Sequence, residues 1–249
     1  MELAFERRGA GPPVVLLHGI GSGWQSWEPV LPALAERFDV IALDLPGFGA
    51  SPPLPEGRRY GVFALADAAE EFWTGLGVER PYVVGHSMGG LVALELSRRG
   101  TVRAASAVSP AGFWSPPERL YVRAVLRGGL LATRLFGADP GDGELPPRDT
   151  PGYLPMVDTI AGYTFWGRPR VPLTLLWGTR DPLLWPRQAR RARRWCPEAR
   201  LVWLPGCGHT PMEDHPTLLA HHLIDAIPPS TAQADTAQAD TAQADAQDR

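Results

Sequence analysis

Three residues of this sequence have the side-chain types that nucleophilic catalysis needs, and each closely follows a short apolar run. Ser87 lies in the segment Gly-His-Ser-Met-Gly-Gly, Asp181 ends the segment Trp-Gly-Thr-Arg-Asp, and His209 ends the segment Pro-Gly-Cys-Gly-His. A serine hydroxyl is a weak nucleophile until a base, most often histidine, removes its proton. An aspartate can hold the imidazole in the correct tautomer and stabilise the imidazolium that forms. We therefore expect Ser87 to be the nucleophile, His209 the general base and Asp181 the acid that orients the base.

The surroundings of Ser87 predict a sharp turn between a strand and a helix. The motif G-x-S-x-G at residues 85–89 follows the apolar run 82–84 and precedes a helix-like stretch that begins near Met88. Glycines let the backbone approach closely in such a turn, and the serine is held in a strained conformation that exposes its hydroxyl. A role for Ser87 as a simple helix N-cap would not explain the glycines on both sides of it.

The other histidines have simpler assignments than His209. His86 is expected to point away from Ser87, because the two residues are adjacent. The remaining four belong to another loop or to the last predicted helix: His18, His215, His221 and His222. His209 lies in a glycine-rich loop directly after the last apolar run, and parallel sheets place their sites in such loops.

Rival acids are also less suitable than Asp181. The apolar run before the one that carries Asp181 ends in Val-Ser-Pro-Ala at residues 108–111, without a carboxylate. Glu213 and Asp214 follow His209 in the chain, which breaks the order serine, acid, histidine that this arrangement requires.

A developing oxyanion would need two backbone N–H donors. One is expected from Met88, the residue after the nucleophile, at the N-terminus of a helix. The other is expected from Ile20, in the glycine-rich loop that follows the apolar run 14–17.

Elements that position these residues can be read from the alternation of apolar runs and helix-like stretches. Strands are predicted at residues 14–17, 40–43, 82–84, 104–108, 173–177 and 201–204, and helices at 27–37, 62–76, 88–98, 186–195 and 216–227. Near-continuous apolar runs favour strands buried on both faces. The pattern predicts an α/β domain with a mostly parallel, doubly wound sheet.

Two regions interrupt this pattern. Residues 113–170 contain helical patches and a Gly/Pro/Asp-rich stretch at 137–155, and they form an insertion between two strands. Arg119, Arg123 and Arg127 have four-residue spacing there, which predicts a solvated helix face, with binding of a substrate anion as the alternative. Residues 230–249 repeat the unit Thr-Ala-Gln-Ala-Asp, have no large apolar residue, and are expected to be a disordered tail.

Composition excludes several classes of partner. A net charge of −3 and a pI near 6.1 give no electrostatic reason to expect nucleic acid. No apolar run is long enough to span a membrane, and the N-terminal residues lack the pattern of a signal peptide. Cys196 and Cys207 flank a predicted strand about 30 Å apart, too far to form a disulfide. Free thiols favour a cytoplasmic location.

Five segments together resemble the α/β-hydrolase superfamily, in its capped, serine-nucleophile form that includes carboxylesterases and lipases. They are His18-Gly19 and residues 44–51, 85–90, 177–181 and 206–209, and the similarity extends from about Leu3 to Ile227. The resemblance implies an α/β-hydrolase core at 1–112 and 171–229, and a short, mainly helical cap at 113–170 before the acid-bearing strand. The usual first strand of the family is missing here.

The resemblance also implies an apolar pocket beneath the cap. Trp24, Trp27, Phe113 and Trp114 are the candidate pocket residues. The expected reaction is cleavage of an activated carbonyl, a carboxylic ester of a small to medium apolar substrate first, through an acyl-enzyme. Thioester, lactone, amide or carbon–carbon bond cleavage, a non-hydrolytic lyase or acyltransferase reaction, and a non-catalytic ligand-binding role are the alternatives.

No cofactor and no metal is required by this chemistry. A small-molecule substrate is the expected partner, and the sequence carries no signal for an oligomeric state.

Overall fold

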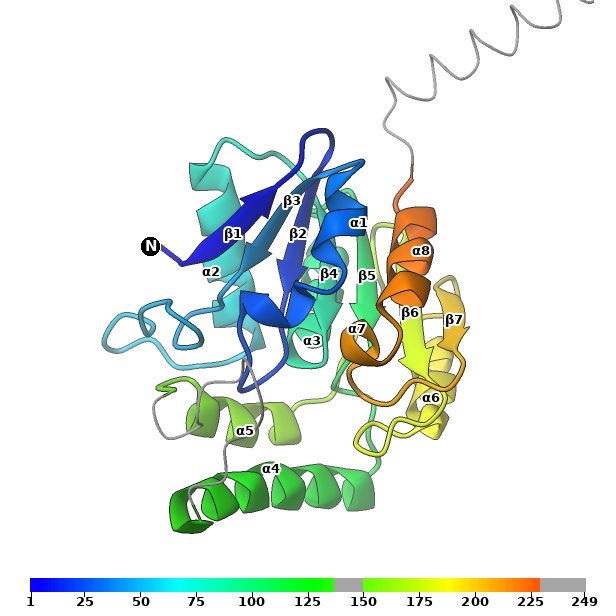
Figure 1. Cartoon of the computed structure of the whole chain (residues 1–249). Helices are drawn as coiled ribbons and strands as arrows, with labels where there is room; N and C mark the ends of the chain where they lie inside the picture. The colour runs from blue at the N-terminus through cyan, green and yellow to red at the C-terminus, as the bar shows by residue number, and fades with distance from the viewer. Residues whose placement is uncertain (137–149, 229–249) are drawn as a thin grey trace, which may run out of the picture.

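A seven-stranded sheet forms the centre of the protein (Figure 1). Six of its strands are mostly apolar, often β-branched runs of five or six residues, and the seventh, at one edge, is a four-residue, mostly charged strand. The computed structural model describes residues 1–136 and 150–228, without the side chains of residues 129–136. The strands, in spatial order, are β1 (Phe5–Arg8), β3 (Asp39–Leu43), β2 (Pro13–Leu17), β4 (Tyr82–His86), β5 (Ala104–Val108), β6 (Leu173–Gly178) and β7 (Arg200–Leu204). Only β1 is antiparallel to its neighbour. The predicted mostly parallel sheet is therefore confirmed.

Helices cover both faces of this sheet (Figure 1). Apolar residues of α2 (Val62–Gly75), α3 (Met88–Arg99) and α6 (Pro186–Trp195) belong to one buried cluster. Those of α1 (Leu31–Ala35), α7 (Pro211–Asp214) and α8 (Pro216–Ala226) belong to a second cluster. Successive residues of a strand point to opposite faces and supply both clusters. The doubly wound architecture follows from this arrangement.

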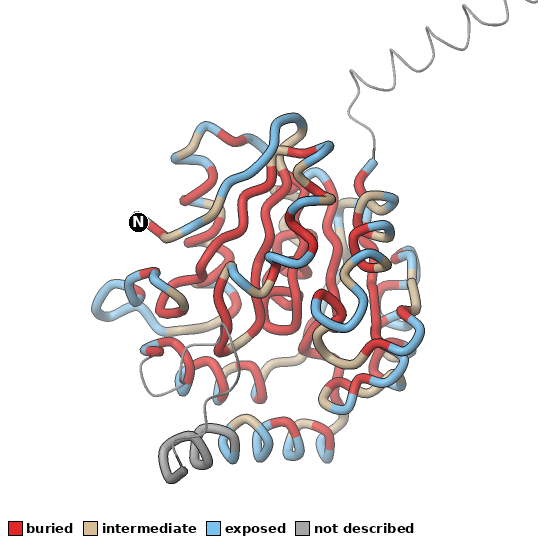
Figure 2. Tube along the Cα trace, viewed as in Figure 1, coloured by how far each residue is buried: buried red, intermediate tan, exposed pale blue. Residues whose placement is uncertain are grey.

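The sheet interior is buried as predicted, with one exception at its edge (Figure 2). Every residue of β4, β5 and β6 is buried. In β7, by contrast, Leu201, Val202 and Trp203 are only partly buried. The prediction that this strand is buried on both faces was wrong, because β7 is the last strand of the sheet and has a neighbour on one side only.

One predicted helix is much shorter than its pattern indicated. Residues 27–37 were expected to be helical, but the structure has a 3₁₀ helix, η1 (Trp24–Trp27), followed by α1. Pro29 and Pro32 account for the difference. A proline in a helix interior lacks the N–H that the helix needs and clashes with the preceding turn, so it is tolerated only near a helix start. Accordingly, α1 begins with Pro32 in its first turn.

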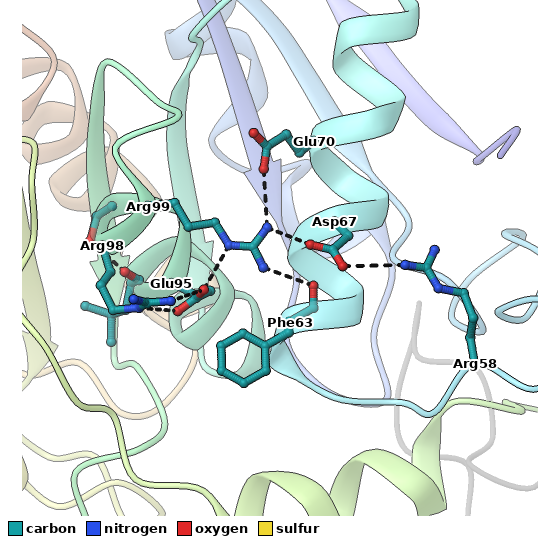
Figure 3. Close-up of polar contacts among 9 residues, drawn as sticks. Arg58, Phe63, Asp67, Glu70, Glu95, Arg98 and Arg99 are labelled. Atoms are coloured by element: carbon teal, nitrogen blue, oxygen red, sulfur yellow. Dashed lines mark hydrogen bonds and ion pairs between the residues drawn. The ribbon is translucent and has the colours of Figure 1, made fainter.

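Charged side chains join α2 to α3, the helix that begins next to Ser87 (Figure 3). Arg99 of α3 donates to Asp67 and Glu70 of α2, at 2.6 and 3.4 Å. Glu95, whose side chain is fully buried, accepts hydrogen bonds from Arg98 and Arg99 at 2.8 Å. Both arginines neutralise this buried carboxylate. Arg99 also binds the acidic side chains of α2, so the network fixes α3 against α2.

The insertion between β5 and β6 contains α4 (Pro116–Phe136) and α5 (Tyr153–Gly162), beside the carboxyl ends of the strands (Figure 1). Its base is closed by the Phe165 N–H, which donates to the Gly112 carbonyl at 3.0 Å. Trp114 Nε1 donates to the Tyr163 carbonyl at 2.8 Å in the same place. The chain therefore enters and leaves the insertion at one point.

The arginine stripe of α4 is only partly solvated. Arg123 and Arg127 are exposed and pair with Asp158 of α5, at 2.9 and 2.6 Å. Arg119 is half-buried instead, and donates to Thr164 Oγ1 at 2.8 Å. For Arg119 the prediction of a solvated residue was wrong, because this end of α4 packs on the chain that leaves α5.

Some predictions concern residues outside the described part of the chain. The predicted tail at 230–249 lies outside it, and so does most of the Gly/Pro/Asp-rich stretch, at 137–149. Within the described ranges, no helix has both the length and the apolar character to cross a bilayer. Cys196 and Cys207 are free, as predicted, and both are buried.

Candidate active site

Ser87 occupies a strained turn between β4 and α3. Its backbone has φ 53° and ψ −108°, a conformation that non-glycine residues rarely adopt. A Cβ at Gly89 would overlap the Leu17 carbonyl oxygen, and one at Gly85 would overlap the Gly89 carbonyl. Only glycine at both positions lets the helix start this close to the sheet, so the local sequence forces the turn that presents the hydroxyl.

The three residues selected from the sequence lie together at the carboxyl ends of the strands. Ser87 follows β4, Asp181 follows β6 and His209 follows β7. His209 Nε2 lies 3.1 Å from Ser87 Oγ, and its Nδ1 lies 2.9 Å from Asp181 Oδ2. This geometry lets one imidazole take a proton from the hydroxyl while the carboxylate holds its other nitrogen.

Asp181 is held as a carboxylate by its surroundings. Its side chain is fully buried, and Oδ1 accepts backbone N–H bonds from Leu183 and Leu184 at 2.9 and 2.7 Å. Burial alone would raise the pKa of Asp181, but the hydrogen bonds from His209 and from these two N–H groups outweigh it and lower the pKa below its ordinary value. Asp181 is thus ionised and fixed in direction.

A second loop, at Gly19 and Ile20, lies beside Ser87. His18 is fully buried, and its Nε2 accepts the Leu45 N–H at 2.9 Å, so Nδ1 carries the hydrogen and donates to the Gly19 carbonyl at 2.6 Å. The N–H of a trans peptide points opposite to its carbonyl. This bond therefore turns the Ile20 N–H away from His18.

The two expected oxyanion donors line one cavity with Ser87. Ile20, Met88, Ser87 and His209 all contribute to its wall. Met88 is the first residue of α3, and the first N–H groups of a helix have no partner within it. The arrangement places two candidate N–H donors and the hydroxyl around the same space.

Asp44 has a structural role. Its carboxylate accepts the Trp24 N–H at 2.6 Å and the Ala50 N–H at 2.8 Å. Ser51 Oγ donates to the backbone carbonyl of Asp44 at 2.7 Å. These bonds shape the turn that follows β3.

The cavity has an apolar wall and a polar rim. It encloses about 680 Å³ with its open mouth included. Apolar side chains from the insertion and from the loop after Asp181 form much of the wall: Trp114, Val122, Leu126, Ile160, Leu183 and Leu184. Polar residues lie on the rim: Ser22, Ser26, Thr210 and Glu213. Such a cavity can hold an apolar group against Ser87.

Of the four candidate pocket residues, the structure places Trp114 in the wall and the other three elsewhere. Phe113 is buried and packs on Phe165, with ring centroids 5.7 Å apart. Trp27 is fully buried in the cluster on the α1 and α8 face of the sheet, and Trp24 packs against that cluster. None of these three lines the cavity: the chain after Ile20 takes Trp24 and Trp27 towards that face, and Phe113 packs on Phe165 in the other cluster.

His86 is a site residue that the sequence interpretation missed. It was expected to point away from the site, but it lines the cavity, and its Nε2 lies 2.7 Å from the His209 carbonyl oxygen. A polar residue inside an otherwise apolar, buried turn was the available signal.

One group of metal-ligand side chains occurs among the described residues, away from this cavity. His221, His222 and Asp225 of α8 have ligand atoms within 4.8 Å of one another, and His221 pairs with Asp225 at 3.4 Å. Two of the three side chains are exposed. We assign no role to this group.

Known proteins resemble this chain over most of its length. The model of the "Alpha/beta hydrolase family" matches residues 14–222. A pimeloyl-[acyl-carrier protein] methyl ester esterase of Chromobacterium violaceum is 31% identical, over 90% of this chain and 98% of the relative. An uncharacterised protein of Mycobacterium tuberculosis is 30% identical, over 86% of this chain and 74% of the relative. An esterase of Thermogutta terrifontis has a similar structure, with a TM-score of 0.70 and 24% identity, over 90% of this chain and 92% of that one.

Proposed function

Because the chain belongs to the alpha/beta hydrolase family, we propose that it is a serine hydrolase that acts through Ser87, His209 and Asp181. One observation carries the proposal: the His209 ring lies between Ser87 Oγ at 3.1 Å and Asp181 Oδ2 at 2.9 Å, beside a cavity. The geometry, in addition to the motif, therefore supports Ser87 as the nucleophile.

The proposed reaction has two halves. In the first, His209 Nε2 takes the Ser87 proton while Oγ attacks the carbonyl carbon, and the N–H groups of Ile20 and Met88 stabilise the oxyanion. His209 then gives the proton to the leaving oxygen, and an acyl-enzyme remains. In the second half, His209 takes a proton from water, the hydroxide attacks the acyl carbon, and the proton returns to Ser87 as the acid leaves.

We propose a carboxylic ester of a small to medium apolar substrate. The apolar wall formed by Trp114, Val122, Leu126 and Ile160 supports an apolar acyl or alcohol group. The esterase named above, with 31% identity over nearly its whole length, supports ester chemistry. In this interpretation residues 113–170 are the cap over a core at 1–112 and 171–229.

Labelling with a fluorophosphonate tests the nucleophile. The folded protein should react, and Ser87→Ala should not. Equal labelling of both proteins would contradict the role of Ser87. A protein that binds ligands without catalysis would neither label at Ser87 nor turn over substrate.

Turnover of a graded substrate panel tests the bond type. The panel contains p-nitrophenyl esters, a thioester, a lactone and a vinylogous diketone. We expect the p-nitrophenyl esters with short to medium acyl chains to be cleaved fastest. If the thioester, the lactone or the diketone were cleaved more than tenfold faster than the esters, the ester assignment would be wrong and the proposed triad would be unaffected.

A further inference from the structure

His86 lies between the two loops that flank the nucleophile. Its side chain is buried in the turn, one residue before Ser87. On one side, its Nε2 lies 2.7 Å from the His209 carbonyl oxygen, and the two rings are in contact with centroids 4.9 Å apart. On the other side, a Cβ at Gly19 would lie 3.0 Å from its Nδ1. The ring therefore fills the space between the base loop and the oxyanion loop.

The contact with His209 fixes the tautomer of His86. A carbonyl oxygen only accepts hydrogen bonds, so Nε2 carries the hydrogen and Nδ1, towards Gly19, does not. Burial and the neighbouring His209 lower the pKa of His86 to about 3, and the other titratable groups that act on it are Asp181 and His18. His86 stays neutral in the working range, so it does not repel the imidazolium that His209 becomes.

The base is consequently held at two points. Asp181 holds the ring of His209 through Nδ1, and His86 holds its backbone through the carbonyl. His86 and Ser87 are consecutive, so the second bond ties the backbone of the base directly to the nucleophile turn. Other contacts hold the residues before the base, since the Gly208 N–H donates to Asp214 Oδ2 at 2.7 Å and the Arg180 N–H donates to the Cys207 carbonyl at 2.9 Å. The bond from His86 acts on the backbone of His209 itself and so bears on the distance from Nε2 to Ser87 Oγ.

We propose that His86 is a positioning residue: through its Nε2–H bond to the His209 carbonyl, it sets the distance between base and nucleophile. The proposal rests on the proposed function, since it concerns the same triad. It predicts that kcat depends on a donor at the Nε2 position and that KM does not depend on this bond, because the bond acts through His209, even though the ring of His86 also lines the cavity.

Two amide variants distinguish the effect of a hydrogen-bond donor at the position of Nε2 from the effect of a polar side chain in general. In His86→Gln the amide nitrogen can reach the position of Nε2, whereas in His86→Asn it stops near the position of Nδ1. We expect His86→Gln to keep kcat within about threefold of the native value. We expect His86→Asn, and His86→Met, to lower kcat about tenfold, as for the loss of one hydrogen bond that leaves a partly buried carbonyl unpaired. KM should stay within about twofold in all three, since a hydrogen bond that contributes nothing to ground-state binding leaves it unchanged.

Equal kcat values for the Asn and Gln variants would overturn the proposal, and so would a loss that appears in KM alone. Unfolding midpoints show whether each variant folds. If Asn and Met do not fold, nitrogen NMR of the native protein decides the question, since a hydrogen on Nδ1 of His86 near pH 7 would contradict it. Absence of fluorophosphonate labelling in the native protein would instead refute the proposed function, and the NMR result would still report on the His86 bond.

Discussion

Glu118 is the residue whose neutralisation we expect to loosen the apolar wall of the cavity. It lies in the first turn of α4, its side chain is fully buried, and it accepts hydrogen bonds from Arg187 Nε at 2.5 Å and Arg191 Nη1 at 2.7 Å. The Ser115 N–H and Oγ donate to it as well, at 2.5 and 2.9 Å. Arg187 and Arg191 belong to α6, so this carboxylate attaches the insertion to the rest of the protein.

The expected loss of stability in Glu118→Gln follows from the pKa of this carboxyl. Burial alone would raise it, but Arg191, Ser115 and Arg187 outweigh burial and lower it from 4.5 to about 2. A shift of this size corresponds to about 3 kcal/mol, and we expect about 2 kcal/mol because Arg187 is more than half exposed and water screens its charge. The folded pKa is the lower one, so the native protein has this stability above pH 4.5 and loses it towards pH 2.

Denaturant unfolding and ester kinetics measure the two consequences. At pH 7 we expect Glu118→Gln to unfold about 2 kcal/mol more easily, and near pH 2 the difference should vanish. Val122 and Leu126 lie one and two turns further along α4 and line the cavity, so KM for longer acyl chains should rise. Asp158→Asn is the matched control, because it removes two exposed ion pairs between α4 and α5 and should cost less than about 1 kcal/mol. Equal effects of both variants, or a difference for Glu118→Gln that does not change with pH, would refute the reasoning.

Three further changes have equally definite expectations. Asp181→Asn should lower kcat about 10⁴-fold with little change in KM, measured with a p-nitrophenyl ester, because the amide no longer holds the tautomer that accepts the Ser87 proton; near-normal turnover would show that another carboxylate serves. Glu213→Gln removes an exposed charge from the cavity rim and should raise kcat/KM for an ester with an anionic acyl group about threefold. The neutral ester of the same length is the control, and an equal change for both would exclude a charge effect. Burial raises the pKa of Cys196 to about 11, so iodoacetamide at pH 8 should leave this thiol unmodified in the folded protein and modify it in denaturant; rapid reaction of the native protein would contradict its burial.

The positions of Ser87, Asp181 and His209 could be predicted because each depends on local signals. Each residue closely follows an apolar run, and parallel strands bring the residues at their carboxyl ends to one edge of the sheet. The glycines at 85 and 89 also indicate, from the sequence alone, a turn in which the backbone segments approach closely. The chemistry of these three residues is a proposal. Their proximity, however, was already expected from their positions after parallel strands.

The lining of the cavity could not be predicted in the same way. Trp27 was a reasonable pocket candidate because it follows the oxyanion loop closely, yet one turn of the chain takes it to the opposite face of the sheet. The face of the sheet on which the loop after Ile20 lies depends on the packing of η1 against α7, and these two helices are distant in sequence. The contact of His86 with His209 is of the same kind, since it joins residues 123 positions apart.

Proline and edge effects explain the errors in the secondary structure. Pro29 and Pro32 shorten the helix predicted at 27–37, although its apolar spacing suits a helix. The composition of β7 matches that of the interior strands, and only its place at the end of the sheet leaves it partly exposed.

The closed base of the insertion makes it a separable unit of the chain. The Gly112–Phe165 bond joins its two ends, and none of the residues proposed to do chemistry lies between them. An exchange of this segment for that of a relative, joined at these two residues, would change the apolar wall and leave the nucleophile, base and acid on their own strands. Substrate range can therefore diverge by replacement of one continuous piece, while the three residues of the proposed reaction are retained.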